Sequence, residues 1–86
     1  MEDLQTLRKC VDEIDSQILK ALKDRITVCQ KIGEYKKQHD IPVLDQAREK
    51  EVFNKVREEA VKFKLEPAQI EVLYREIVNM CSDIQK

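Results

Sequence analysis

The sequence is poor in residues that interrupt regular structure, with one glycine and two prolines among 86 residues. A fold of many short strands needs a turn about every 8–12 residues, and so few breakers do not supply those turns. The longest apolar run is three residues, whereas a membrane-spanning helix needs roughly 20. We therefore expect an all-α fold, a single small domain over residues 1–86 and no membrane segment.

The chain also lacks an excess of charge of either sign. Lys and Arg number 16 and Asp and Glu 17, which gives a net charge of −1, and the two signs are interleaved. This balance removes the electrostatic argument for a nucleic acid partner. The acidic start Met1-Glu2-Asp3 is unlike a secretory signal, so we expect a cytoplasmic location.

Metal-binding and nucleophile motifs are missing as well. Cys10, Cys29 and Cys81 lie far apart, and His39 is the single histidine, so no zinc-ligand spacing exists and a Ser/His/Asp triad has little support. An odd number of cysteines without a sign of secretion favours reduced thiols. We expect no metal and no cofactor, and we interpret these four residues as packing or surface residues.

A sustained heptad stripe is the strongest pattern present. It runs from Asp3, a suitable helix N-cap, towards Pro42, which disfavours helical geometry at the residue before it. Nine of its ten a and d positions are apolar, as in a coiled coil. The ten positions are Leu4, Leu7, Val11, Ile14, Ile18, Ala21, Arg25, Val28, Ile32 and Tyr35. The stripe predicts a helix over about residues 3–39, within which Gly33 suggests a close approach of another backbone.

Two shorter helices are expected to follow, over about residues 46–63 after the N-cap Asp45 and over about 67–85 from Pro67, which suits a first helical turn. A first helix of about 37 residues is roughly 55 Å long, whereas a compact chain of this size has a radius of gyration of roughly 12 Å. The shorter helices cannot cover such a rod. We expect an intertwined homodimer; the alternative is a broken helix that folds back as a monomeric bundle.

Some charged residues lie where the pattern calls for apolar ones. Arg25 occupies an a position, and Lys36 points the same way roughly 16 Å further along the axis. Glu49 leads into the apolar face of the second helix, with Arg48 beside it and Asp45 at the cap. An unpaired buried charge is costly, so these residues indicate either ion pairs or a ligand pocket.

Gln85 follows Cys81 by one turn at the edge of the third helix face, and adds an uncharged amide to these candidates. Arg8 lies roughly 25 Å from Arg25 along the helix, so it can reach the same small ligand only from an antiparallel partner chain. Several cations and an amide favour a polyanionic substrate, because arginine binds carboxylates bidentately. Without a metal or a nucleophile, positioning and electrostatic stabilisation are the remaining means of catalysis.

Several motifs are spread over essentially the whole chain: Leu7-Arg8-Lys9-Cys10-Val11-Asp12-Glu13-Ile14-Asp15, Leu22-Lys23-Asp24-Arg25, Ile32-Gly33-Glu34-Tyr35-Lys36, Pro42-Val43-Leu44-Asp45-Gln46-Ala47-Arg48-Glu49, Cys81 and Gln85. In these residues the chain resembles the all-helical family of chorismate mutases. The resemblance implies three helices per chain in an intertwined dimer, and a Claisen rearrangement of chorismate to prephenate, towards phenylalanine and tyrosine, without covalent catalysis. With no linker or second domain expected in the chain, the enzyme would be monofunctional.

The same resemblance implies roles for the arginines. Arg25, and Arg8 supplied by the partner chain, would bind the carboxylates of chorismate, and Arg48 would line the carboxylate side of the pocket. Cys81 stands where related enzymes have a serine hydroxyl, and a thiol is a weaker donor. Cys81 is therefore included only as a possible pocket residue.

The remaining roles concern the reacting bond and the ring. Lys36 and Gln85 would donate to the ether oxygen, and Glu49 would accept from the ring hydroxyl with help from the backbone N–H of Asp45. Two alternatives remain open: a lyase on the same scaffold that splits isochorismate into salicylate and pyruvate, and a non-catalytic helical dimerisation module. Such a module would need the stripe but not the polar residues.

Overall fold

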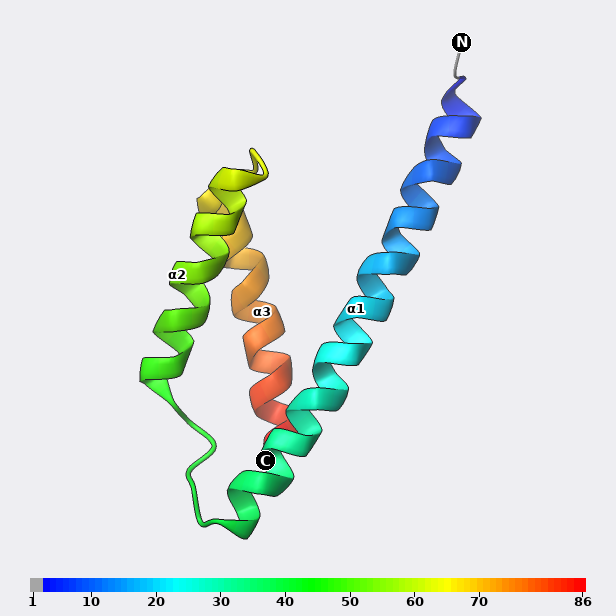
Figure 1. Cartoon of the computed structure of the whole chain (residues 1–86). Coiled ribbons are helices and arrows are strands. Elements are labelled where there is room, and N and C mark those ends of the chain that lie inside the picture. The colour runs from blue at the N-terminus through cyan, green and yellow to red at the C-terminus, as the bar shows by residue number, and fades with distance from the viewer. Residues whose placement is uncertain (1–2) are drawn as a thin grey trace.

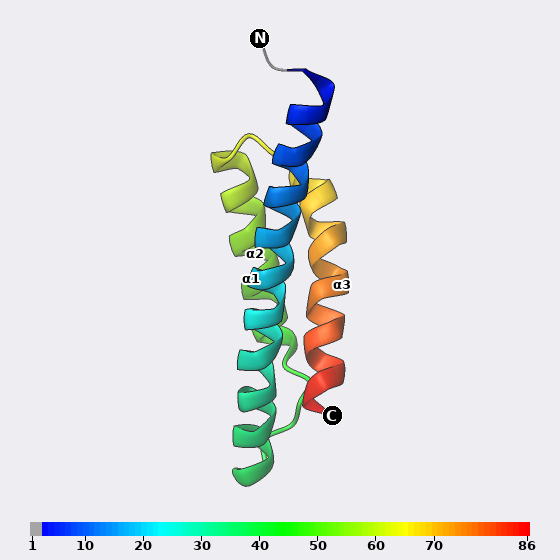
Figure 2. The ribbon, with the colours of Figure 1, turned by 90° about the vertical axis from the view of Figure 1, so that its right-hand side faces the viewer.

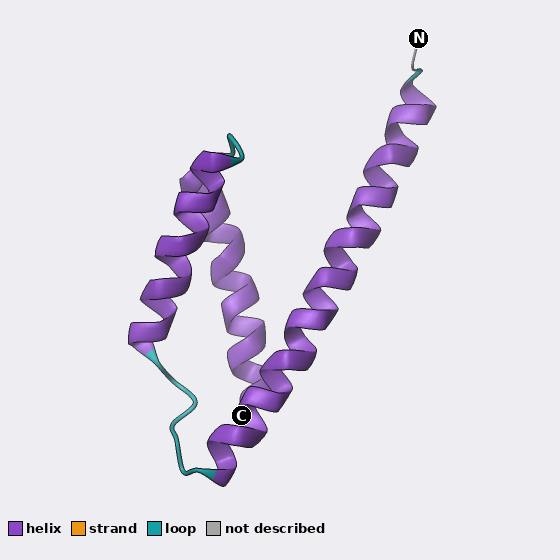
Figure 3. Ribbon diagram, in the orientation of Figure 1, coloured by secondary structure: helices purple, strands orange, loops and turns teal. Residues whose placement is uncertain are grey.

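The computed structural model describes residues 3–86, so Met1 and Glu2 of the acidic start lie outside the described residues. Over that range the chain is all-helical and contains α1 (Leu4–Gln38), α2 (Gln46–Lys62) and α3 (Pro67–Gln85). Figure 3 shows helix and loop along residues 3–86, without a strand. The prediction of an all-α fold of three helices is confirmed. In the same range, no helix is long and apolar enough to cross a membrane.

Each helix begins at an acidic cap. Asp3 accepts from the backbone N–H three residues on at 2.8 Å, Asp45 does the same at 3.0 Å, and Glu66 accepts from the N–H of Ala68 at 3.3 Å. These bonds satisfy backbone donors that a helix start otherwise leaves free. The hydrogen bond to the backbone lowers the pKa of Asp3, since it stabilises the charged carboxylate.

Two residues with left-handed backbone follow the first two helices and end them. Asp40 has φ 55° and Lys64 has φ 59°, a conformation that does not continue a right-handed helix. After Asp40, the chain passes through Pro42 and reaches the cap of α2 in an extended connection. These two reversals produce the order long helix, short helix, short helix seen in Figure 1.

The packing centres on α3, which contacts both other helices. Figure 1 and the side view in Figure 2 show α2 and α3 as an antiparallel pair, with α3 running parallel to α1 and meeting its C-terminal half. The buried apolar side chains are few and lie along these two contacts: Cys29, Val56, Ala60, Val78 and Cys81. In this arrangement, α2, α3 and the C-terminal half of α1 form one packed unit.

The N-terminal half of α1 protrudes from this unit. Every residue from Asp3 to Ala21 is exposed, and the stripe residues Leu4, Val11 and Ile18 are 56–60% exposed. The molecule is 58 Å long with a radius of gyration of 16.2 Å, well above the roughly 12 Å of a compact chain of this size. The rest of the chain therefore leaves the apolar stripe uncovered.

Candidate active site

A cavity of about 140 Å³ lies where the C-terminal half of α1, the start of α2 and the end of α3 meet. Seven of the eight residues singled out in the sequence line it: Arg25, Lys36, Asp45, Arg48, Glu49, Cys81 and Gln85. Its other lining residues are Cys29, Ile32, Val43, Val52, Val78 and Ser82. The residues singled out in the sequence, apart from Arg8, thus converge on one concave site.

Lys36 and Gln85 form the polar link between α1 and α3. The Lys36 Nζ donates to Gln85 Oε1 and to the carbonyl oxygen of Val43, at 2.9 Å in each case. Both polar side chains are half-buried. An ammonium has three N–H groups, so after these two bonds one remains for a ligand. The Gln85 amide also keeps its N–H₂ donors, because the lysine occupies only its oxygen.

Arg25 lies against two thiols. Its Nη1 donates to Cys81 Sγ at 2.7 Å and lies 3.9 Å from Cys29 Sγ. Among residues 3–86, no carboxylate forms a salt bridge with Arg25. A guanidinium has five N–H donors and sulfur is a weak acceptor, so a carboxylate ligand would be a stronger partner than either thiol. Cys81, the residue with an open role in the sequence, therefore holds Arg25 at the cavity wall.

The Cys29 thiol has a perturbed acidity. Its burial foremost, and then its hydrogen bond with Cys81 and the repulsion between the two groups, raise the pKa of Cys29 to about 11, although Arg25 and Lys36 oppose the shift. Cys29 is accordingly a neutral thiol at physiological pH. The pocket wall beside Arg25 is uncharged there, and the guanidinium is not neutralised by a Cys29 thiolate.

We predict that Cys29 resists alkylation by iodoacetamide at pH 8 in the folded protein. With a pKa of about 11, about one Cys29 thiol in a thousand is ionised at that pH, and the thiolate is the reactive form. Mass spectrometry of peptides from native protein should show little adduct at Cys29. The same chain in denaturant is the reference, and equal rates in the two states would contradict the prediction.

Three residues at the start of α2 line the cavity, and their side chains differ in the partners that they bond. The Asp45 carboxylate is occupied as the helix cap. The Arg48 side chain lies in an exposed ion pair with Glu51 at 3.3 Å, and such a pair contributes at most about 1 kcal/mol, so it gives way readily to a ligand. Glu49 is half-buried and, in the described part of the chain, forms no salt bridge. Its carboxylate is therefore available as an acceptor.

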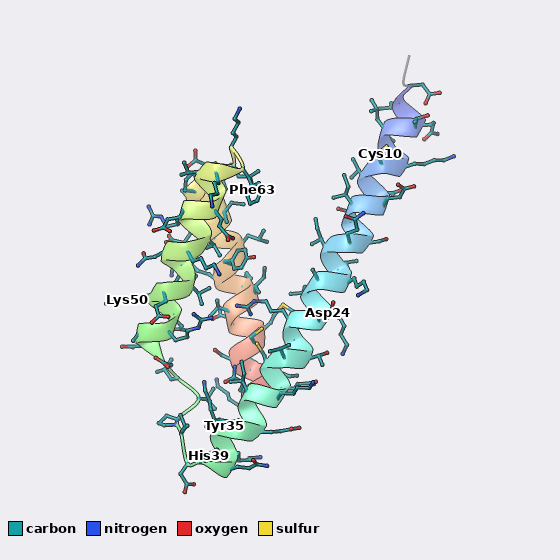
Figure 4. The ribbon with its side chains drawn as sticks, viewed as in Figure 1. Cys10, Asp24, Tyr35, His39, Lys50 and Phe63 are labelled. Carbon is teal, nitrogen blue, oxygen red and sulfur yellow. The ribbon has the colours of Figure 1, made fainter. Side chains whose placement is uncertain are left out.

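Arg8 is the predicted residue that stays apart. It lies exposed on the protruding half of α1, roughly 25 Å along the axis from Arg25. In Figure 4, Cys10 marks that half of the helix, and Tyr35 and His39 mark the end that belongs to the packed unit. Within a single chain, Arg8 cannot contact a small ligand in the cavity.

Ser82 is the polar lining residue that the sequence reading did not single out. It is half-buried and faces both this cavity and a neighbouring one that also contains Glu49. Its position three residues before Gln85 on the same helix could have identified it, because residues three or four apart share a face. No comparable sequence signal marks the apolar lining residues Ile32 and Val43.

A family model and three relatives that are named as mutases indicate one family. Residues 7–86 match the model of the chorismate mutase type II family. A bifunctional chorismate mutase/prephenate dehydratase of Aquifex aeolicus is 34% identical over 89 residues, which cover 100% of this chain and 25% of the relative. A chorismate mutase of Methanocaldococcus jannaschii is 39% identical over 57 residues, which cover 66% of this chain and 58% of the relative.

A 4-amino-4-deoxychorismate mutase of Streptomyces pristinaespiralis is 31% identical over 77 residues, which cover 90% of this chain and 60% of the relative. The chain thus spans between a quarter and three fifths of the length of these relatives. A solved structure, a conserved hypothetical protein of Pyrococcus furiosus, has a TM-score of 0.77 and 34% identity and covers 96% of this chain and 95% of that chain. Since the family model extends over nearly all of the sequence, this protein belongs to the chorismate mutase type II family.

Proposed function

We propose that the protein rearranges chorismate to prephenate on the route to phenylalanine and tyrosine. The observation that carries the proposal is the Lys36–Gln85 hydrogen bond of 2.9 Å in a cavity that also holds Arg25. An ammonium and an amide are held together there, and both keep N–H groups that can donate to one oxygen. Membership of the chorismate mutase type II family supports the same reaction.

The proposed mechanism uses electrostatics and restraint. The Arg25 guanidinium exchanges its thiol contact for a substrate carboxylate, and Arg48 lines the carboxylate side of the pocket. Lys36 and Gln85 donate to the ether oxygen, on which negative charge grows as the C–O bond breaks. Because these two bonds strengthen in the transition state, they lower the barrier more than they tighten substrate binding.

Binding of the ring completes the substrate pose. Glu49 accepts a hydrogen bond from the ring hydroxyl, and the backbone N–H of Asp45 assists from the start of α2. Holding the enolpyruvyl arm folded over the ring supplies the orientation that a unimolecular rearrangement needs. No step of this scheme transfers a proton or forms a covalent bond to the protein.

We further propose an intertwined homodimer in which the long helices pair and Arg8 of one chain completes the cavity of the other. The support is the apolar stripe, which the rest of its own chain leaves exposed over residues 4–21. Pairing would remove this stripe from water and would bring Arg8, distant within one chain, near a second cavity. A cytoplasmic location stays a prediction from the sequence.

A direct assay tests the proposed activity. Purified protein is incubated with chorismate, with isochorismate and with 4-amino-4-deoxychorismate, the substrate in the name of one relative, and products are separated by chromatography. We expect loss of chorismate and equal gain of prephenate. Turnover of isochorismate alone would assign the lyase activity instead, and turnover of none would overturn the proposal.

We predict that kcat/KM for chorismate changes by less than about twofold between pH 5 and 7.5. The residue beside Lys36 is an amide, which donates without first taking up a proton. The matched variant Gln85→Glu should be active mainly at acidic pH, because a carboxyl group donates only when protonated. A steep fall of the unmodified enzyme over this range would contradict the role of Gln85.

A further inference from the structure

Gly33 lies on α1 directly against the last turn of α3. A Cβ at this position would lie 2.9 Å from the backbone Cα of Gln85 and 3.2 Å from its Cβ and Cγ. The first distance is shorter than a carbon–carbon contact allows, and the atom it meets belongs to the main chain. Any larger residue at 33 therefore requires α3 to move.

Nothing else at this position calls for glycine. Its φ is not positive, so the backbone is ordinary helix that alanine adopts freely. In a helix interior, glycine costs about 1 kcal/mol relative to alanine. Helix propensity alone therefore disfavours glycine at position 33. The structure gives the reason for a glycine there, since a larger residue would clash with the backbone of Gln85.

The same contact determines the position of the Gln85 amide relative to α1. Lys36 follows Gly33 by three residues and so lies on the same side of α1. The backbone of Gln85 rests on Gly33, while its Oε1 accepts from Lys36 Nζ at 2.9 Å. A displacement of the last turn of α3 would move the amide relative to the ammonium.

We propose that Gly33 is a positioning residue that lets the Gln85 amide reach the reacting oxygen together with Lys36. This inference rests on the proposed mutase activity. The buried contacts of Val56 and Ala60 lie in the α2–α3 pair, away from the last turn of α3. A Gly33→Ala variant can therefore keep its fold while the amide is displaced.

The expected effect of Gly33→Ala is a fall in kcat of about tenfold to a hundredfold, since a misplacement of about 1 Å at a reacting centre has effects of this size. KM for chorismate should stay within about twofold, because the amide acts mainly in the transition state. A purely structural glycine would change thermal stability but not the kcat of the folded enzyme.

A double-mutant cycle with Gln85→Ala tests whether the Gly33→Ala substitution lowers kcat by displacing the Gln85 amide. If Gly33 acts through the amide, Gly33→Ala causes no further loss of kcat in a Gln85→Ala background. Multiplying losses would overturn the proposal, as would full activity of Gly33→Ala itself. Glu34→Ala, a substitution at the exposed neighbouring position, is the matched control and should leave kcat unchanged.

A second variant decides the question if Gly33→Ala does not fold. Gln85→Asn withdraws the amide by one methylene and leaves the α1–α3 backbone contact in place, so kcat should fall nearly to the level of Gln85→Ala. Full activity of Gln85→Asn would show that the amide position is unimportant and would refute the inference. If the unmodified enzyme converts no chorismate, the proposed function fails first. The NMR resonances of the Gln85 side-chain amide, which should shift in Gly33→Ala, then test the contact separately.

Discussion

A Lys36→Ala enzyme is expected to lose at least about 10³-fold in kcat for chorismate while its helical circular dichroism spectrum stays unchanged. Removal of one preorganised donor to a developing oxyanion reduces kcat by about 10²–10³-fold. The loss should lie at or above the upper end of this range, because Lys36 also holds the Gln85 oxygen and the carbonyl oxygen of Val43 at 2.9 Å. Steady-state kinetics over a wide chorismate range would separate kcat from KM.

Lys31→Ala is the matched control for this substitution. Lys31 lies on the same helix, is exposed and does not line the cavity, so its removal changes the net charge equally and should alter kcat by less than about twofold. Lys36→Arg should recover little activity, because a planar guanidinium does not reproduce the geometry of an ammonium. Normal turnover of chorismate by Lys36→Ala would contradict the role of Lys36 as a donor to the ether oxygen.

A mixture of two inactive variants should recover activity if the site is shared between chains. Arg8→Ala and Lys36→Ala each impair every site of their own homodimers. In a heterodimer of the two variants, one site combines the intact Lys36 of the Arg8→Ala chain with the intact Arg8 of the Lys36→Ala chain. The second site carries both substitutions. Random pairing makes half the dimers mixed, so about a quarter of all sites are intact.

The experiment requires co-expression or joint refolding, followed by a chorismate assay of the mixture. The control pairs Arg25→Ala with Lys36→Ala, two residues that line one cavity of one chain. That mixture contains no intact site and should stay inactive. Equal behaviour of the two mixtures would show that Arg8 does not act in a neighbouring chain. Sedimentation should give twice the chain mass for every variant.

The fold was largely predictable from a few residues. Asp3, Asp45 and Pro67 mark the helix starts, and each carries a local signal that needs no tertiary contact. Pro42 separates the long helix from the short ones for the same reason. The heptad stripe determines which face of α1 is apolar, but it does not reveal whether a second chain covers that face.

Prediction of the site depended on residues that break the apolar pattern. Arg25 stands out because a charge inside an apolar stripe needs an explanation, and Lys36 stands out because it points the same way along the helix. The residues that these two side chains contact could not be predicted. The Arg25–Cys81 contact joins positions 56 residues apart, and it exists only because α3 packs parallel to α1. Ser82 was not singled out because a serine, unlike a charge, does not break the apolar pattern of a helix, and only its spacing from Gln85 pointed to it.

The small core has a consequence for the concentration at which the proposed enzyme works. Among residues 3–86, five apolar side chains are buried, which is few for a chain of this length, so much of the folding free energy of the proposed dimer would come from association. Association follows mass action, and each tenfold dilution weakens the assembled state by about 1.4 kcal/mol. A chain that is scarce in the cell would then be partly unfolded as well as inactive.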